Sequence, residues 1–241
     1  MSTFPAGSGS RLVIASVVLL GLAACQTSPR AKETSPAAQP APDQMEIPAG
    51  AHEYKVVAEE SLLQILVYRG GTMARLGHNH VIASHNLAGS VYVSDDLTQT
   101  RFDITFPVNE LTIDEPAMRE QAGADFPPGV PQSARDGTRA NLLSEALLDG
   151  AKYPAIRLRA TEVVAAGDYF DVDVEITLKD QVHHVRAPIH VQRKDGGITA
   201  SGEFPLKQSE LGLKPFSAAL GALLVVDEMR VHFDVTARSA N

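Results

Sequence analysis

Apolar and polar residues alternate strictly over many short segments of this chain. The clearest case is residues 170–179, where Phe170, Val172, Val174, Ile176 and Leu178 are each followed by a charged or polar residue. The same alternation occurs in residues 61–68, 87–93, 101–108, 156–160, 185–191, 198–204 and 229–236. A period of two is typical of strands with one face in water and one face in a core. The pattern therefore predicts an all-β fold.

Many short strands in succession favour either a sandwich or an up-and-down barrel. The predicted domain begins and ends with strands, and pairing these two would close the sheet and remove its exposed edges. We therefore expect an antiparallel barrel of about eight strands. The side chains expected inside it include Ile104, Phe106, Leu158, Val174, Ile176, Ile189 and Phe233.

The middle of the chain has a different pattern. Residues 114–150 contain few β-branched residues and a turn-rich stretch at 123–137. Leu142, Leu143, Ala146 and Leu147 follow helical spacing, so we expect a short helix over 138–148 that ends at Gly150. The fold class predicted from the whole chain is thus an all-β barrel with one or two short helices.

The N-terminus has the pattern of an export signal. Arg11 precedes an apolar run, residues 12–24, that is short for a membrane span. The sequence Leu22-Ala23-Ala24-Cys25 resembles the bacterial lipobox, which implies a signal peptide at residues 1–24 and acylation of Cys25. Gln26, where an Asp would imply retention at the inner membrane, resembles the outer-membrane default. The alternative is a plain signal peptide cleaved after Ala24.

The residues after Cys25 are expected to form a tether. Residues 26–50 are rich in Pro, Ala, Ser, Thr and Gln and cannot bury enough apolar area to offset the entropy of ordering them. We assign residues 25–50 to the lipidated cysteine and this tether, and residues 51–241 to the barrel domain. The expected location is the periplasmic face of the cell envelope, on the outer membrane.

Composition and charge exclude one class of partner. The net charge is −8 and the sequence contains no run of Lys and Arg. Neutralising nucleic-acid phosphates requires clustered cations, so no nucleic-acid partner is expected.

Cys25 is the only cysteine, so the domain cannot form an internal disulfide and must be stabilised by its core.

Three segments together resemble the YceI-like family of the bacterial envelope. The first is Gly77-His78-Asn79-His80 with the following Leu87-Ala88-Gly89, where one branch of the family carries the same Gly-His-Asn-His. The second runs from Gly137 to the Tyr153-Pro154-Ala155-Ile156 strand start. The third runs from Ile176-Thr177-Leu178 through Phe204-Pro205-Leu206 to Pro215-Phe216. The resemblance covers roughly residues 54–238.

This resemblance implies a lipocalin-like barrel that binds polyisoprenoid lipids. The chain departs from the family pattern at Lys179-Asp180-Gln181-Val182, where His-Gly-Val-Thr is usual, and at Leu211, where an aromatic is common. These departures leave the fold in place and leave the identity of the ligand open.

Histidines raise a metal hypothesis. His78 and His80 are two residues apart, which would place both on one side of a strand, and His183, His184, His190 or His232 could supply a third ligand. The alternative is that His78 and His80 are hydrogen-bonded structural residues near a barrel mouth. We assign no metal and no cofactor to the chain.

Catalytic patterns are scarce. The sequence contains no Gly-x-Ser-x-Gly elbow and no phosphate-binding glycine loop. The adjacent carboxylates Asp114-Glu115 and Asp227-Glu228 are expected to be solvated charges at strand ends. We therefore expect a binding protein, not an enzyme, with no catalytic residues.

The ligand hypothesis depends on the interior of the barrel. Small residues on the expected inward register, Gly89, Ala160, Ala187, Ala200 and Gly202, would leave room for a ligand. We expect Phe106, Phe204, Leu213 and Phe216 to contact the tail of an isoprenoid or other apolar lipid. His78, Asn79 and His80 are the candidates for the mouth that meets its head. The alternative is a filled core in a module that binds another envelope protein.

Overall fold

The computed structural model describes residues 45–194 and 196–239, and these form one compact unit. The predicted signal peptide, Cys25 and most of the predicted tether lie outside the described residues. The strands are β1 His52–Val56, β2 Leu62–Gly70, β3 His80–Ser84, β4 Ala88–Val93, β5 Arg101–Pro107, β6 Thr112–Ile113, β7 Ala155–Ala166, β8 Tyr169–Leu178, β9 Gln181–Lys194, β10 Gly197–Lys207, β11 Ser217–Ala218 and β12 Leu223–Ser239. The α-helices are α1 Pro116–Ala122 and α2 Gln132–Leu143.

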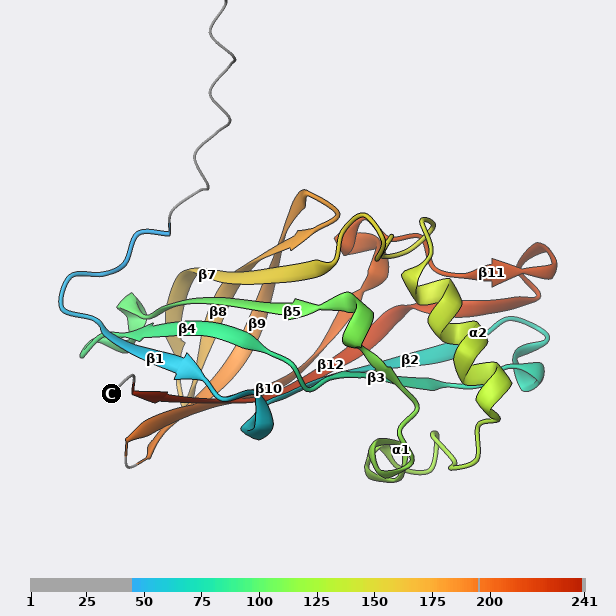
Figure 1. Cartoon of the computed structure of the whole chain (residues 1–241), viewed down its shortest axis with the longest axis horizontal. Helices are drawn as coiled ribbons and strands as arrows, with labels where there is room; N and C mark the ends of the chain where they lie inside the picture. The colour runs from blue at the N-terminus through green and yellow to red at the C-terminus, as the bar shows by residue number, and fades with distance from the viewer. Residues whose placement is uncertain (1–44, 195, 240–241) are drawn as a thin grey trace, which may run out of the picture. The chain divides into compact units, whose positions relative to one another are not determined.

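Eight of these strands close an antiparallel barrel. The order around it is β1-β4-β5-β7-β8-β9-β10-β12, and the pairing of Tyr54 with Ser239 joins β1 to β12. The first and last strands thus pair, which confirms the expected closure (Figure 1).

Strand β12 is long enough to take two neighbours on one side. Its last residues pair with β1, and residues 224–234 pair with β2, which continues into β3 and β6. This extension lengthens the wall at one end of the barrel, where α1 and α2 also lie (Figure 1). The fold prediction of an all-β barrel with two short helices is confirmed.

The predicted helix begins and ends earlier than expected. Pro131 precedes α2, and its carbonyl accepts hydrogen bonds from the Ala134 and Arg135 amides. The helix ends at Leu143 because Ser144 is extended, with φ −68° and ψ 161°. The C-cap residue is Ser144 and not Gly150, although the Gly150 amide donates to the Leu143 carbonyl at 3.1 Å. A Cβ there would lie 2.9 Å from Asn109 Oδ1, so glycine permits a close approach of two segments.

Two glycines expected to open the interior have another role. Gly89 has φ +142°, and a Cβ on it would lie 2.1 Å from the Asp103 carbonyl oxygen. A Cβ on Gly202 would lie 2.3 Å from the Pro188 carbonyl oxygen. Both glycines therefore allow neighbouring strands to approach closely. Reading them as open space was wrong, because any side chain at Gly89 would disrupt the β4–β5 pairing before it filled a cavity.

No helix among residues 45–194 and 196–239 has the length and apolar character needed to cross a bilayer.

Candidate ligand-binding site

The barrel encloses a cavity of about 270 Å³. All but two of the residues that line it are apolar, the exceptions being Thr100 and Gln208. The seven side chains predicted to face inward, Ile104, Phe106, Leu158, Val174, Ile176, Ile189 and Phe233, all line this cavity. The alternation in the sequence therefore gave the correct strand register.

Several inward side chains are incompletely covered by protein. Phe102, Leu158, Phe170 and Phe233 lie on the cavity wall and pack on the core, yet remain only partly buried. Well-packed cores leave few voids larger than a water molecule. A cavity this large in the middle of the barrel does not fit the filled core that the partner-binding alternative assumed.

Three of the four predicted tail contacts line the cavity. Phe106 is buried in its wall, and Phe204 and Leu213 line it while partly exposed. Phe216 does not line it and is 37% exposed. No residue from 214 to 228 lines the cavity, so Phe216 belongs to a segment that lies outside the wall.

Where α2 packs on the barrel, the cavity is lined by residues that the strand pattern could not assign to it. Leu142 in α2 and Leu147 and Leu148 just after it line the cavity. Their helical spacing indicated an apolar face, but not the surface it would cover. Gln208 joins them, and its side-chain amide donates to the Val226 carbonyl at 2.9 Å.

Thr100 is the other polar residue on the wall, and no pattern along the chain indicated it. Its hydroxyl oxygen is buried and has no hydrogen-bond partner among the residues that the structure describes. Buried hydroxyls almost always have a partner, so this one is available to a polar group of a bound molecule.

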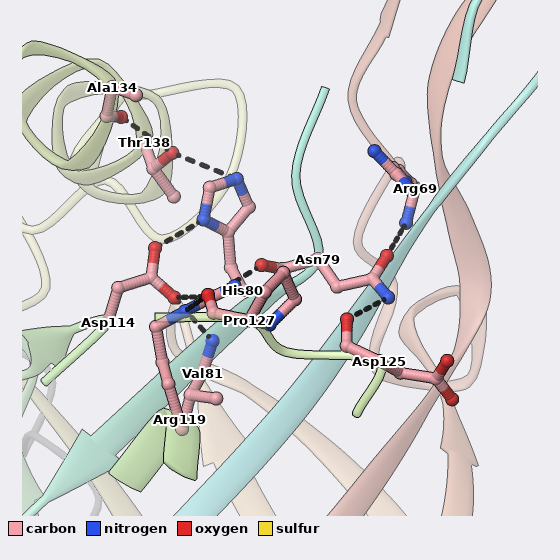
Figure 2. Close-up of polar contacts among 10 residues, drawn as sticks. All are labelled: Arg69, Asn79, His80, Val81, Asp114, Arg119, Asp125, Pro127, Ala134 and Thr138. Atoms are coloured by element: carbon pink, nitrogen blue, oxygen red, sulfur yellow. Dashed lines mark hydrogen bonds and ion pairs between the residues drawn. The ribbon is translucent and has the colours of Figure 1, made fainter. Parts of the chain in front are cut away.

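The three residues predicted for the mouth do not line the cavity. Asn79 accepts a hydrogen bond from the Arg69 amide at 3.0 Å and donates to the Asp125 carbonyl at 2.9 Å. His80 Nδ1 lies 2.6 Å from Asp114 Oδ2, and its Nε2 lies 3.3 Å from the Thr138 hydroxyl (Figure 2). His78 is exposed, with its ring 6.1 Å from that of His80. Their predicted contact with a ligand head stays a prediction.

Asp114 is the centre of this polar cluster. Asp114 is 2% exposed. Its carboxylate accepts hydrogen bonds from the Val81 amide at 2.9 Å and from the Arg119 guanidinium at 2.5 Å, and it also faces the His80 ring. The expectation that Asp114 is a solvated charge was wrong, because β3–β6 pairing brings it beneath His80 and Val81. Burial alone would raise the pKa of Asp114, but the hydrogen bonds from His80, Val81 and Arg119 outweigh it and hold the pKa below its usual value of 3.8.

Arg119 extends the cluster to the loop after α1. It is 1% exposed and donates to the backbone carbonyls of Asn79 and Pro127 in addition to Asp114 (Figure 2). The cluster of His80, Asp114, Arg119 and Thr138 therefore ties β3, the segment after β6, α1 and α2 together. We call these four residues the polar clamp. Its Thr138 contact and the Arg139 guanidinium, which donates to the Leu111 and Asn109 carbonyls, together hold α2, and with it Leu142, beside the cavity.

The same contacts bear on the metal hypothesis. Both ring nitrogens of His80 already face protein groups. His184 faces Asp173 at 2.9 Å, and His232 faces Asp234 at 3.0 Å, on other strands. Within residues 45–194 and 196–239, no group of three or more His, Cys, Asp or Glu side chains is arranged to hold a metal ion.

The other candidate carboxylates also have structural partners. Glu115 accepts from Thr112 and faces His85 at 2.8 Å, and Asp227 accepts from the Ser209 amide and hydroxyl at 2.9 and 2.6 Å. None of these groups lines the cavity. Among the described residues, the site is thus an apolar chamber with one unpartnered hydroxyl, an arrangement that suits the binding of an apolar molecule.

The comparisons agree with this architecture. The chain resembles the solved structure of BcnA from Burkholderia cenocepacia, at 14% identity and a TM-score of 0.55, over 75% of this chain and 98% of that one. It also resembles a polyisoprenoid binding domain from Saccharophagus degradans implicated in plant cell wall breakdown, at 13% identity and a TM-score of 0.52, over 78% and 98%.

At such identities these likenesses show a shared fold. No curated protein matches the chain in sequence. The sequence profile of the YceI-like domain, however, matches residues 54–237, which is nearly all of the barrel. The chain therefore belongs to the YceI-like family.

Proposed function

We propose that the barrel binds a long-chain isoprenoid, or a similar apolar lipid, in its cavity and sequesters or carries it. The observation that supports this most directly is the wall itself, which is apolar except for Thr100 and Gln208. An apolar cavity of about 150 Å³ suffices to bind benzene in a protein core, and this one, at about 270 Å³, is larger.

The binding energy would come mainly from apolar area. Each Å² of tail removed from water contributes about 25 cal/mol, so burying about 300 Å² would supply about 7.5 kcal/mol before the costs of association. The polar head requires few partners, and the Thr100 hydroxyl is the candidate donor to it. A relative of the same fold is described as a polyisoprenoid binding domain, which supports the choice of ligand class. The proposal assigns no chemical change to the ligand.

Uptake can be measured by native mass spectrometry. We expect the purified protein to gain the mass of one polyprenol or quinone when the lipid is added from detergent, and organic extraction of protein from its own envelope should yield a lipid of the same class. A protein that gains no mass from any isoprenoid and yields no lipid on extraction would contradict the proposal.

We further propose that the protein is a lipoprotein anchored through Cys25 on the periplasmic face of the envelope. The support is the lipobox-like sequence before Cys25 and its place ahead of a Pro- and Ala-rich segment. Acyl chains on the cysteine would hold the protein at a membrane, since more than one lipid signal gives stable anchoring. Cells fed radiolabelled fatty acid should label the wild-type protein and not Cys25→Ser. Equal labelling of both proteins would reject the assignment.

A further inference from the structure

Exposed apolar side chains gather at one end of the described structure. Eight large hydrophobic residues are exposed among residues 45–194 and 196–239, and five of them fall in two segments, 71–77 and 214–226. We call these two segments the tip. The five residues are Met73, Leu76, Phe216, Leu220 and Val226.

The two segments of the tip lie against each other. The Met73 amide donates to the Ala222 carbonyl at 2.7 Å, and Gly70 pairs with Leu224. A Cβ on Gly77 would lie 3.1 Å from the Leu223 side chain. In Figure 1 the loop between β2 and β3 and the hairpin that carries β11 extend together at the end where α2 lies. The five apolar residues thus lie on two segments that pair with each other. Exposed apolar side chains that gather in one place on a protein surface mark an interaction site.

The backbone holds the most exposed of them outward. Ala219 and Leu220 have φ of +49° and +56°, and Gly221 follows with φ +87°. Left-handed conformations are unfavourable for Ala and Leu and persist where the surroundings impose them. Here they leave the Leu220 side chain fully exposed to solvent.

Charge separates the tip from the rest of the chain. The whole sequence has 29 acidic residues in 241, so two or three would be expected among the 20 residues of the tip, yet it contains none. It contains Arg75 and Lys214, both exposed, and Arg69 lies beside it and donates to the Gly77 carbonyl. The acids nearest in sequence to the segment 214–226 are Glu210, which is exposed, and Asp227, whose carboxylate accepts hydrogen bonds from the Ser209 amide and hydroxyl.

We infer that the tip docks on an anionic lipid bilayer, with its apolar side chains among the acyl chains and its cations at the headgroups. Protruding apolar residues with Lys and Arg beside them favour binding at a membrane interface, where each cation near an anionic surface contributes about 1 kcal/mol. Leu213, which precedes Lys214, lines the cavity. Docking would therefore bring the α2 end of the barrel to the bilayer. The inference goes beyond ligand binding and does not require it.

A depth probe on the full-length chain tests this directly. Cys25→Ser removes the only native thiol. An environment-sensitive fluorophore is then attached to the cysteine of Leu220→Cys, and the labelled protein is mixed with vesicles of phosphatidylglycerol and phosphatidylethanolamine. We expect blue-shifted emission, quenched by nitroxides placed roughly 5–10 Å below the headgroups. The control position is Val164→Cys, an exposed apolar site in β7 outside the tip, which should stay unquenched. Replacing Arg75 with Gln should weaken partition of the tip about fivefold.

The other outcomes overturn the inference. Emission from Leu220→Cys that stays water-like, or quenching equal to that at Val164→Cys, would exclude docking by the tip. A blue shift that depends on protein concentration and needs no vesicles would assign the tip to a second copy of this chain. A variant with a filled cavity, Ala200→Phe, should still be quenched at the tip, so failure of docking and failure of ligand binding are distinguishable.

Discussion

Replacing Asp114 with Asn is expected to lower the free energy of unfolding by about 3–5 kcal/mol, the range measured when one member of a buried ion pair is removed. The Arg119 guanidinium is 2% exposed in its side chain and would keep its charge without a carboxylate opposite it. Asn tolerates the φ of +54° at this position, so the backbone would not confound the result. Urea unfolding of the two proteins measures the difference.

Glu115→Gln is the matched control. Glu115 is the next residue and also loses its charge, but its side chain is 35% exposed and its partners are Thr112 and His85. We expect this variant to lose less than about 1 kcal/mol, as exposed ion pairs do. An equal decrease in the free energy of unfolding for the two variants would contradict this account, because burial of the Asp114–Arg119 pair would then have no effect of its own.

The clamp also has a pH dependence of known sign. The pKa of Asp114 in the folded protein lies below 3.8, so its carboxylate stabilises the fold fully above that value and loses this contribution as the pH falls through the folded pKa. Unfolding of the wild-type protein should therefore become easier as the pH falls below about 3.8. Asp114→Asn should lose less stability over the same interval.

The second large effect is expected on ligand affinity. Ala200 lies on the cavity wall, between Val191 of β9 and Val235 of β12, which also line it. A Phe side chain at this position would occupy space in the cavity and reduce the buried area of a bound tail by about 100 Å². At about 25 cal/mol per Å², this loss weakens binding by about 2.5 kcal/mol, which raises Kd roughly 70-fold. Titration with a polyprenol would measure it.

Ser201→Phe provides the comparison. Ser201 is the next residue in β10 and does not line the cavity. The same added ring should leave Kd unchanged there, and circular dichroism would confirm that both variants keep the barrel. Equal affinities for Ala200→Phe and the wild type would place the ligand outside the cavity.

Local sequence patterns predicted most of the barrel because its strands have one wet and one dry face. Strand β8 is the best case, since its inward residues Val172, Val174 and Ile176 alternate strictly and are all buried. The pattern missed the start of β12, however. Leu223, Leu224, Val225 and Val226 are apolar without alternation, because this part of the strand forms the tip and precedes an irregularity at Val225–Met229.

The site was less predictable because its key contacts join residues far apart in the chain. Asp114 and His80 are 34 residues apart and meet only because β3 pairs with β6. Leu142 faces the cavity because contacts with distant residues, those of Thr138 with His80 and of Arg139 with the Leu111 carbonyl, hold α2 there. Gly89 looked like open space, since no local pattern distinguishes a small side chain facing a cavity from a glycine required by φ +142° and a close backbone contact.

The location of the ligand tests the central claim most directly. Methyl NMR of selectively labelled isoleucines separates Ile104, Ile176 and Ile189, which line the cavity, from Ile47, which is 52% exposed and does not. On addition of a long-chain polyprenol, the three cavity methyls should shift and show nuclear Overhauser contacts with the isoprenoid chain, while Ile47 should do neither. Cavity methyls that stay unchanged under saturating lipid would contradict a lipid-binding interior.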